Sequence, residues 1–169
     1  MKSERLEFRF FTGPCNHLGI SSVNVQNDPF VAVLYKNHPL AKNPHVTLEE
    51  LSNDSFILGS SDGWHNYLEH LLRICEKAGF TPNIVQQAFN SDGIFGLIAC
   101  EMGITIHSGT TFAYRKEDLV VVPIKNVDET LPTLATWKSE NNSQVRQVFI
   151  DFLHKKFNEN LIDTSNTAN

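Results

Sequence analysis

The sequence lacks the features on which membrane proteins, secreted disulfide-rich proteins and zinc proteins depend. No apolar run approaches the roughly 18 residues of a membrane-spanning helix, and the opening residues MKSER contain no apolar stretch resembling a secretory signal. The three cysteines, Cys15, Cys75 and Cys100, are an odd number at unrelated spacings. They are typical of small buried side chains in a reducing compartment. These absences predict a cytoplasmic protein that does not enter a membrane.

Positively charged residues are also fewer than negatively charged ones. Fourteen Lys and Arg residues stand against 19 Asp and Glu residues, for a formal net charge of −5. Because a nucleic-acid surface neutralises phosphates with clustered positive charge, we do not expect this chain to hold DNA or RNA by itself. Its 169 residues are 41% hydrophobic and 20% charged, which is the composition of a globular chain with one core or two small lobes.

Short β-rich runs alternate with amphipathic helical segments, a pattern that favours an α/β architecture. We expect strands at residues 6–11, 30–35, 55–58, 84–88, 104–106, 119–124 and 131–137. We expect a very short capped helix from Thr47, and longer helices at residues 64–78, 92–102 and 143–157. The run Phe30–Tyr35 is almost continuously apolar, as in a strand covered on both faces. The last helix is expected to bury a single stripe made of Val145, Val148, Phe149, Phe152, Leu153 and Phe157.

One segment carries a family resemblance. The residues from Asp28 to Ala41, DPFVAVLYKNHPLA, resemble the D-P-x-V-x-V-L-x-x-x-H-P-L-A crossover segment of LysR-type transcriptional regulators. Residues 47–51 and 55–58 are similar to the short helix and strand that precede the effector loop in that family. Residues 75–82 and 93–103 continue the match in the expected order. Each motif is weak alone, but together they make nearly the whole chain resemble the regulatory domain of this family.

The resemblance implies an α/β fold of the type 2 periplasmic-binding-protein class, with two lobes joined by two crossover strands. On that plan, residues 1–29 are a remnant of the first lobe. Residues 30–126 form the second α/β lobe, which the chain enters through the crossover strand at 30–35. Residues 127–157 return to the first lobe as a strand and a closing helix, and residues 158–169 are a frayed tail.

The resemblance also sets expectations for what is missing. The family carries a winged helix-turn-helix and further βα units before the position of Met1. At ~30 residues per unit, on the order of 60 residues of the first lobe are absent, so we expect an incomplete first lobe. DNA binding is then expected only through a winged helix-turn-helix that this chain lacks. The exposed apolar surface predicts a homo-oligomer, either a dimer unlike that of the family or a swapped first lobe, that covers Phe149, Phe152 and Phe157.

The loop Gly59–Trp64 is the leading candidate site, because it lies between a predicted buried strand and a helix N-terminus. Such a junction offers unpaired backbone N–H groups and the positive end of a helix dipole, which suit a carboxylate. Ser60 and Ser61 add hydroxyl donors, and the Trp64 ring could stack on a ligand. The resemblance implies that this loop faces the effector. The same residues suit simpler roles, because Ser60, Ser61 or Asp62 could cap the helix and Trp64 could anchor packing.

Five further residues are candidates. Asn90 and Ser91 begin the next predicted helix and, by the resemblance, would face the same cleft, or they could cap that helix. Ile94 would form an apolar wall, Thr12 would contribute from the first lobe, and His107 follows a strand near the cleft. The expected effector-binding residues are Ser60, Ser61, Trp64, Asn90, Ser91, Ile94, Thr12 and His107.

The segment GSSDG matches the nucleophile-elbow pattern G-x-S-x-G, so a serine hydrolase is an alternative. Ser61 would be the nucleophile, with Asp118 and His154 in the required order. No glycine-rich oxyanion segment lies upstream, so we expect no enzyme. The histidines are scattered, and His65 and His70 are five residues apart, not the four that align two metal ligands on a helix. We expect no metal and no cofactor.

These observations together predict the effector-sensing regulatory domain of a LysR-type regulator. It would bind a small metabolite, with an organic acid as the expected class, in the cleft between its lobes. One alternative is a solute-binding protein of a transporter, which shares the fold, although no secretion signal is present here. The other is the hydrolase that uses Ser61.

Overall fold

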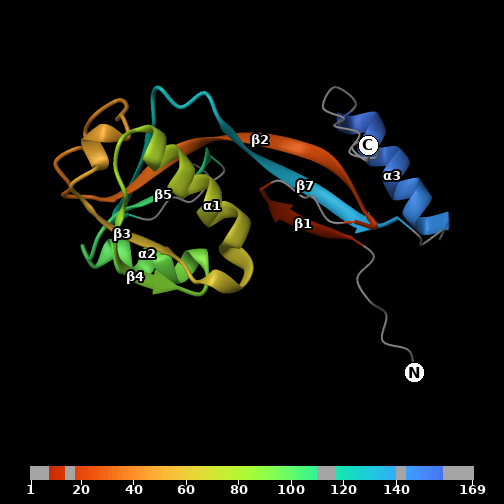
Figure 1. The fold of residues 1–169 in the computed structure, drawn as a ribbon, viewed down its shortest axis with the longest axis horizontal. Coiled ribbons are helices and arrows are strands. Elements are labelled where there is room, and N and C mark those ends of the chain that lie inside the picture. The colour runs from red at the N-terminus through yellow and green to blue at the C-terminus, as the bar shows by residue number, and fades with distance from the viewer. Residues whose placement is uncertain (1–7, 14–17, 110–116, 140–143, 158–169) are drawn as a thin grey trace. The chain divides into compact units, whose positions relative to one another are not determined.

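The computed structural model describes residues 8–13, 18–109, 117–139 and 144–157 (Figure 1). Strands and helices alternate along the chain, as the sequence predicts. The strands are β1 (Arg9–Thr12), β2 (Ile20–Tyr35), β3 (Ser55–Gly59), β4 (Asn83–Ala88), β5 (Thr105–Ser108), β6 (Leu119–Pro123) and β7 (Thr130–Lys138). The helices are the 3₁₀ turn η1 (Glu49–Leu51), α1 (Ser61–Lys77), α2 (Ser91–Ala99) and α3 (Gln144–Phe157).

The chain divides into two units. The first unit comprises Met1–Asn27 with Pro132–Asn169, and the second comprises Asp28–Leu131. Two strands are shared between them, because β2 crosses the boundary after Asn27 and β7 crosses back after Leu131. The chain therefore enters and leaves the second unit along these two connecting strands. The assignment of the units to the lobes of the predicted fold stays a prediction.

The second unit is built around the second half of β2. This segment pairs antiparallel with β5, where Phe30 faces Ser108, and with β6, where Val31 faces Pro123. Strands β3 and β4 run parallel to each other, and a bridge from Phe56 to Ile104 links β3 with the chain just before β5. The result is a sheet region with α1 and α2 following its two parallel strands.

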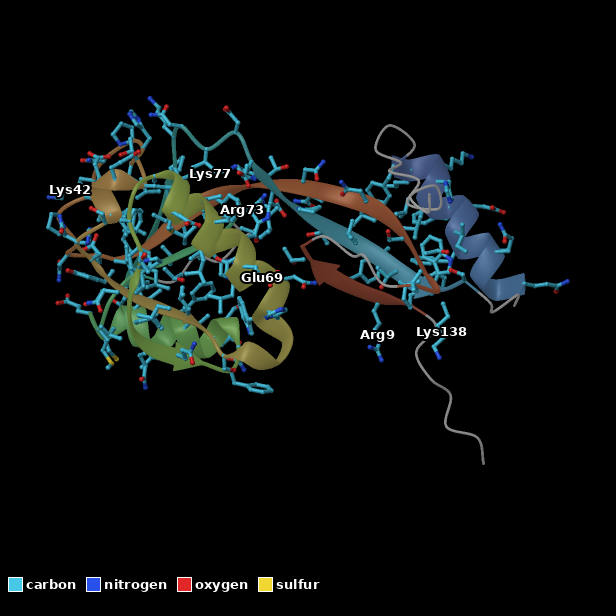
Figure 2. The ribbon with its side chains drawn as sticks, in the orientation of Figure 1. Arg9, Lys42, Glu69, Arg73, Lys77 and Lys138 are labelled. Carbon is cyan, nitrogen blue, oxygen red and sulfur yellow. The ribbon has the colours of Figure 1, made fainter. Side chains whose placement is uncertain are left out.

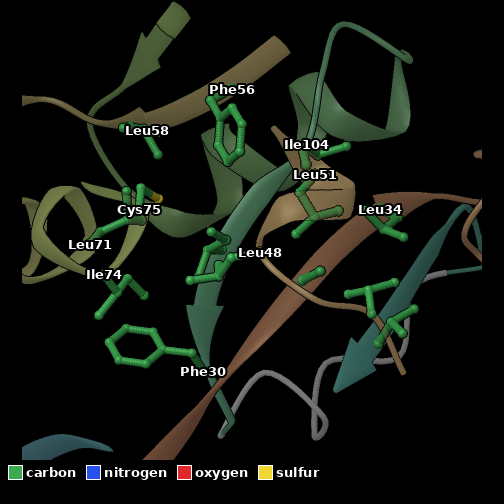
Figure 3. Packing of buried hydrophobic residues seen from close by; sticks show 14 of the residues in the cluster. Phe30, Leu34, Leu48, Leu51, Phe56, Leu58, Leu71, Ile74, Cys75 and Ile104 are labelled. Atoms are coloured by element: carbon green, nitrogen blue, oxygen red, sulfur yellow. The ribbon is translucent and has the colours of Figure 1, made fainter. Parts of the chain in front are cut away.

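The core of the second unit covers both faces of β2. Phe30, Ala32 and Leu34 belong to a large cluster with residues of β3 and α1 (Figure 3). Val33, which points the other way, belongs to a smaller cluster that includes Ile98 of α2. Ala32, Val33 and Leu34 are all 0% exposed. The prediction that this strand is covered on both faces is confirmed.

The short capped helix is also confirmed. The backbone N–H of Thr47 donates to Glu50 Oε2 at 2.7 Å, and the backbone N–H of Glu50 donates to Thr47 Oγ1 at 3.4 Å. This reciprocal pair is a capping box. It starts the 3₁₀ turn η1, whose Leu51 is fully buried in the larger core cluster.

Three boundaries differ from the prediction for identifiable reasons. Helix α1 begins at Ser61 instead of Trp64, so the expected polar turn is already helical. Helix α2 ends at Ala99 instead of Met102, because the chain turns at Glu101 with φ 59°. Strand β2 begins ten residues before Phe30, because its polar first half is held by pairing with neighbouring strands and not by an apolar run of its own.

The first unit contains β1, α3, the part of β2 up to Asn27, and the part of β7 from Pro132 onward. Strand β1 pairs antiparallel with β7, and Arg9 faces Thr136. Its core consists of Val23, Ala135, Trp137, Ile150 and Leu153.

The predicted stripe of α3 was partly wrong. Val148 is 71% exposed and Phe152 is 52% exposed, whereas Ile150 is buried. Leu153 is buried, and Phe149 and Phe157 pack at the edge of the core as expected. The helix presents a narrow face to a small sheet, so only one side of the broad apolar pattern is covered. Ser143, the Val145 side chain and the tail at 158–169 lie outside the described residues.

Candidate functional site

The candidate site is formed where two helices begin. Helix α1 follows β3 and α2 follows β4, and these strands are parallel. Parallel strands end at the same edge, so the two helix N-termini share that edge, as they do at ligand sites of many α/β proteins. The backbone N–H of Ser60 donates to the carbonyl oxygen of Ala88 at 2.9 Å, which ties the two helix starts together. Two positive dipole ends therefore face one region of the second unit.

His107 of β5 lies at the centre of an aromatic group beside these helix starts. Its ring centroid is 5.9 Å from that of Trp64, 5.9 Å from that of Tyr67 and 5.4 Å from that of Phe95. Trp64 and Tyr67 come from the first two turns of α1, and Phe95 comes from α2. Aromatic rings from two helices, α1 and α2, thus surround the imidazole of β5.

The hydrogen bonds of His107 indicate its tautomer. The backbone N–H of Ser108 donates to Nδ1 at 2.9 Å, so Nδ1 acts as an acceptor. In a neutral imidazole the hydrogen is then on Nε2, which lies 3.4 Å from Ser91 Oγ. Burial lowers the pKa of His107 to about 4, so the ring is neutral at pH 7. Ser91 Oγ accepts from the ring, and its own O–H remains a donor that can turn toward a ligand.

Trp64 is fixed in place by two interactions. Its Nε1–H donates to the carbonyl oxygen of Phe89 at 3.2 Å, and its ring meets that of Tyr67 edge to face at 5.4 Å. The ring also lies directly against Gly59, since a Cβ at that position would be 2.1 Å from Trp64 Cδ2. Trp64 is therefore a packing anchor, and it also forms one wall beside His107.

The structure separates the two roles considered for Asn90 and Ser91. Asn90 caps α2, because its Oδ1 accepts from the backbone N–H of Gly93 at 2.9 Å. Ser91 faces His107 instead. Ile94 is 1% exposed and packs with Val33 and Phe95 in the smaller core cluster.

Ser60 is the N-cap residue of α1, but its hydroxyl makes no capping hydrogen bond to the described backbone. The side chains of Ser61 and Asp62 lie outside the described residues. Thr12 ends β1 in the first unit. The binding roles of all eight predicted residues stay predictions.

Sequence reasoning missed Tyr67 and Phe95, because their spacing is that of ordinary core positions. Tyr67 is buried, its hydroxyl donates to the carbonyl oxygen of Ile106, and burial raises its pKa, so it stays protonated. Its position one turn after Trp64 is the one signal that could have included it.

The hydrolase alternative gains no geometric support from the backbone. Ser61 opens α1 two residues after β3 ends. It is not among the described residues with positive φ, whereas a nucleophile elbow needs a sharp, strained turn. Asp118 belongs to the second unit and His154 to the first.

Neither a metal cluster nor a membrane-spanning helix is found among the described residues. They contain no group of three or more His, Cys, Asp or Glu side chains arranged to hold a metal ion. None of their helices has both the length and the apolar character needed to cross a membrane.

Comparison with known proteins gave consistent matches. A family model described as LysR substrate binding domain matches residues 1–158. The chain is 25% identical over 137 residues to the HTH-type transcriptional regulator AlsR of Bacillus subtilis, covering 81% of this chain and 45% of AlsR. It is 34% identical over 113 residues to the transcriptional dual regulator GltC of the same organism, covering 66% of this chain and 37% of GltC. The chain thus spans less than half the length of either relative.

Solved structures match as well. The BenM effector binding domain with its effector benzoate has a TM-score of 0.72 at 20% identity, covering 91% of this chain and 68% of that one. The effector binding domain of QuiR in complex with shikimate has a TM-score of 0.76 at 19% identity, covering 90% of this chain and 72% of that one. These likenesses confirm the predicted fold class, which is that of type 2 periplasmic binding proteins.

Proposed function

The chain belongs to the LysR substrate-binding domain family, and from that premise we propose that it senses a small organic acid. The observation that carries the proposal is the neutral, half-buried His107 beside Ser91, at the edge where α1 and α2 begin. Benzoate and shikimate, which the two similar domains bind, are both ring carboxylates. A carboxylate is the ligand class that such an edge suits best.

Each residue has a definite role in this proposal. The carboxylate would accept hydrogen bonds from backbone N–H groups at the helix starts and from the hydroxyls of Ser60 and Ser91. His107 would act as a positioning residue, because its Nε2–H can donate to Ser91 Oγ, 3.4 Å away, and leave the hydroxyl hydrogen of Ser91 available to a ligand. Trp64 would cover the apolar part of the ligand. Ser61, Asn90, Ile94 and Thr12 remain predicted contacts.

Sensing follows from differential binding. A ligand shifts a conformational equilibrium only if it binds one arrangement more tightly than another. The second unit holds the candidate site and connects to the first through β2 and β7 alone among the described strands. We infer that ligand binding biases these connections, and that a DNA-binding part of the regulator responds to the change.

Calorimetric titration with benzoate and shikimate tests the proposal. We expect at least one of them to bind, and Ser91→Ala to weaken that binding roughly 10- to 100-fold, the equivalent of losing one hydrogen bond to a charged group. Ser52→Ala is the matched control, because Ser52 is a serine of the second unit whose hydroxyl donates to the Glu49 carbonyl oxygen at 2.7 Å. Equal affinity of the Ser91→Ala protein and the wild type, or no binding of either acid, would overturn the assignment.

A further inference from the structure

A pocket of about 270 Å³ lies at the C-terminal end of α1, the opposite end of the helix from Trp64. Lys77, the last residue of α1, lines it. A helix advances by ~1.5 Å per residue, so Trp64 and Lys77 are roughly 20 Å apart along its axis. The pocket is therefore separate from the candidate site, and all of its lining residues belong to the second unit.

The walls of the pocket are the start of η1, the end of α1 and the segment between β6 and β7 (Figure 1). That segment is fixed on both sides. The backbone N–H of Lys125 donates to the carbonyl oxygen of Val46 at 2.8 Å, and Leu131 is fully buried in the larger core cluster. Val127 packs against the same cluster, and Asn126 turns the chain with φ 61°. Core packing thus holds the walls in place without a ligand.

The buried part of the lining is apolar. Leu48 and Ile74 are buried members of the larger core cluster, and Ala78 and Val127 are half-buried against it. Pockets for drug-sized ligands have volumes of roughly 300–1,000 Å³, so this one suits a smaller molecule. Its apolar lining has room for a short aliphatic chain.

Two of the charged lining residues are already paired with each other. Lys77 Nζ donates to Glu129 Oε1, and Arg73 Nη2 lies 2.8 Å from Glu129 Oε2. Arg73 and Lys77 are both labelled on α1 in Figure 2. The hydrogen bond from Lys77 lowers the pKa of Glu129, so the pair is ionised and neutralises itself. It leaves little net charge for a ligand.

The other charged lining residues are available to a ligand. Lys125 and Asp128 are exposed, and neither forms an ion pair with a described side chain. Hydrogen bonds from its own backbone N–H and from Thr47 lower the pKa of Glu49, so this carboxylate is ionised. The negative end of the α1 dipole lies at the same place. The pocket thus offers carboxylates to a cation and one ammonium group to an anion.

We propose that this pocket binds a small zwitterion with a short aliphatic side chain, which is the chemistry of an aliphatic α-amino acid. The ammonium group of the ligand would lie beside Glu49 and Asp128, and its carboxylate would face Lys125. Its side chain would contact the apolar lining. This site differs from the candidate site in place and in ligand, so either assignment can fail without the other.

Nuclear magnetic resonance titrations of the ¹⁵N-labelled full chain test the proposal, with the backbone amides of Asn126 and Asp128 as the readout. The probes are L-leucine, isoamylamine, which lacks the carboxylate, and isocaproate, which lacks the ammonium group. We expect leucine to bind with a dissociation constant on the order of 1 mM, as suits a ligand of about nine non-hydrogen atoms. Each of the other two probes should bind roughly 3- to 10-fold more weakly, because it loses one exposed charge interaction.

Two variants assign the charged groups of the pocket. Lys125→Met should weaken leucine binding roughly 3- to 10-fold and leave isoamylamine binding unchanged, because isoamylamine has no carboxylate. Asp128→Asn should weaken the binding of both. The matched controls are Lys42→Met and Asp118→Asn, at exposed residues of the second unit outside the pocket lining. Lys42 is labelled in Figure 2. Neither control should change the affinity for leucine.

The amide spectrum of each variant shows whether it is folded. An absence of saturable shifts at Asn126 and Asp128 up to about 10 mM leucine would overturn the proposal. Equal affinity for leucine and isocaproate at these amides, or no effect of Lys125→Met on leucine binding, would also overturn it. Leucine shifts confined to Ser60 and Ser91 would place the amino acid at the candidate site instead. Isocaproate that binds at the candidate site shifts those two amides, so its binding there is distinguished from binding in the pocket.

Discussion

Gly59 and Trp64 fit each other so closely that the start of α1 depends on the absence of a side chain. Gly59 is buried at the end of β3, and the Trp64 ring occupies the space that a Cβ would need. Gly96, in α2, offers a contrast, because a Cβ there would meet nothing within 4 Å.

This contrast yields a stability prediction. Gly59→Ala should lower the free energy of unfolding by about 1–3 kcal/mol, because the Trp64 ring or the strand end must move. Gly96→Ala should leave it unchanged or raise it by up to about 1 kcal/mol, because alanine is the better helix former. Urea unfolding of both variants measures the difference. Equal stability of the two variants would mean that the ring does not lie against Gly59.

His107 predicts a pH dependence of stability. Its pKa is about 4 in the folded chain, against an ordinary value of 6.5. Between these values the unfolded chain binds more protons, so the free energy of unfolding falls as the pH is lowered from 6.5 to 4. His107→Gln should reduce this fall by on the order of 3 kcal/mol.

Urea unfolding at several pH values measures the effect. His65→Gln is the control, because the His65 side chain is 73% exposed. If His107→Gln shows the same pH dependence as the wild type, the ring is not buried in its neutral form.

For single residues, the sequence predicts which side chains lie near the site better than it predicts which of them touch one another. Ser91, Trp64 and His107 were identifiable because each lies at a strand end or a helix start. The contact between Ser91 and His107 was not, because it depends on β5 returning beside the start of α2. The ion pairs of Glu129 with Arg73 and Lys77 of α1 were not predicted either, because nothing in the local sequence around Glu129 indicates partners on a distant helix.

At the scale of elements, α2 is specified at both ends by single residues. Asn90 caps its start, and the turn through Glu101 ends it. Gly103 lies two residues after this turn. A Cβ there would be 2.5 Å from the carbonyl oxygen of Ser55, so the backbone at Gly103 packs directly against β3.

The Asn90 cap of α2 should contribute to the stability of the fold. Asn90→Ala should lower the free energy of unfolding by about 1 kcal/mol, because the Gly93 N–H loses its acceptor. Asn43→Ala, at an exposed asparagine in a turn, should have little effect. Thermal or urea unfolding compares the two. A cap that can be removed without cost would show that Asn90 is free to serve as a ligand contact instead.

Elements with a strong local pattern were predicted closely, and elements held by their neighbours were not. The apolar run of β2 and the amphipathic pattern of α1 each specify one structure. The first half of β2 is polar, so only its strand partners identify it. The pattern of α3 allows several buried faces, and the small sheet of the first unit selects the one that contains Ile150 and Leu153.

At the scale of the molecule, the first unit leaves apolar surface uncovered. Val148 and Phe152 of α3 are 71% and 52% exposed, and Phe10 of β1 is 58% exposed. Large exposed apolar side chains grouped on one small unit are typical of an interaction surface.

We therefore expect the chain to associate with itself. Light scattering at micromolar concentration should show a species larger than one chain, and Phe152→Asp should shift it toward the monomer by placing a charge on the apolar surface. Gln144→Asp, at another exposed position of α3, should not. A wild-type protein that is monomeric at these concentrations would contradict this expectation.

We propose that a small carboxylate binds where α1 and α2 begin, beside His107. The most direct test is a nuclear magnetic resonance titration of the ¹⁵N-labelled chain with benzoate and with shikimate. At least one acid should shift the backbone amides of Ser60, Ser91 and Ser108, while those of α3 should move little. Saturable shifts confined to other regions, or no shifts with either acid, would contradict it.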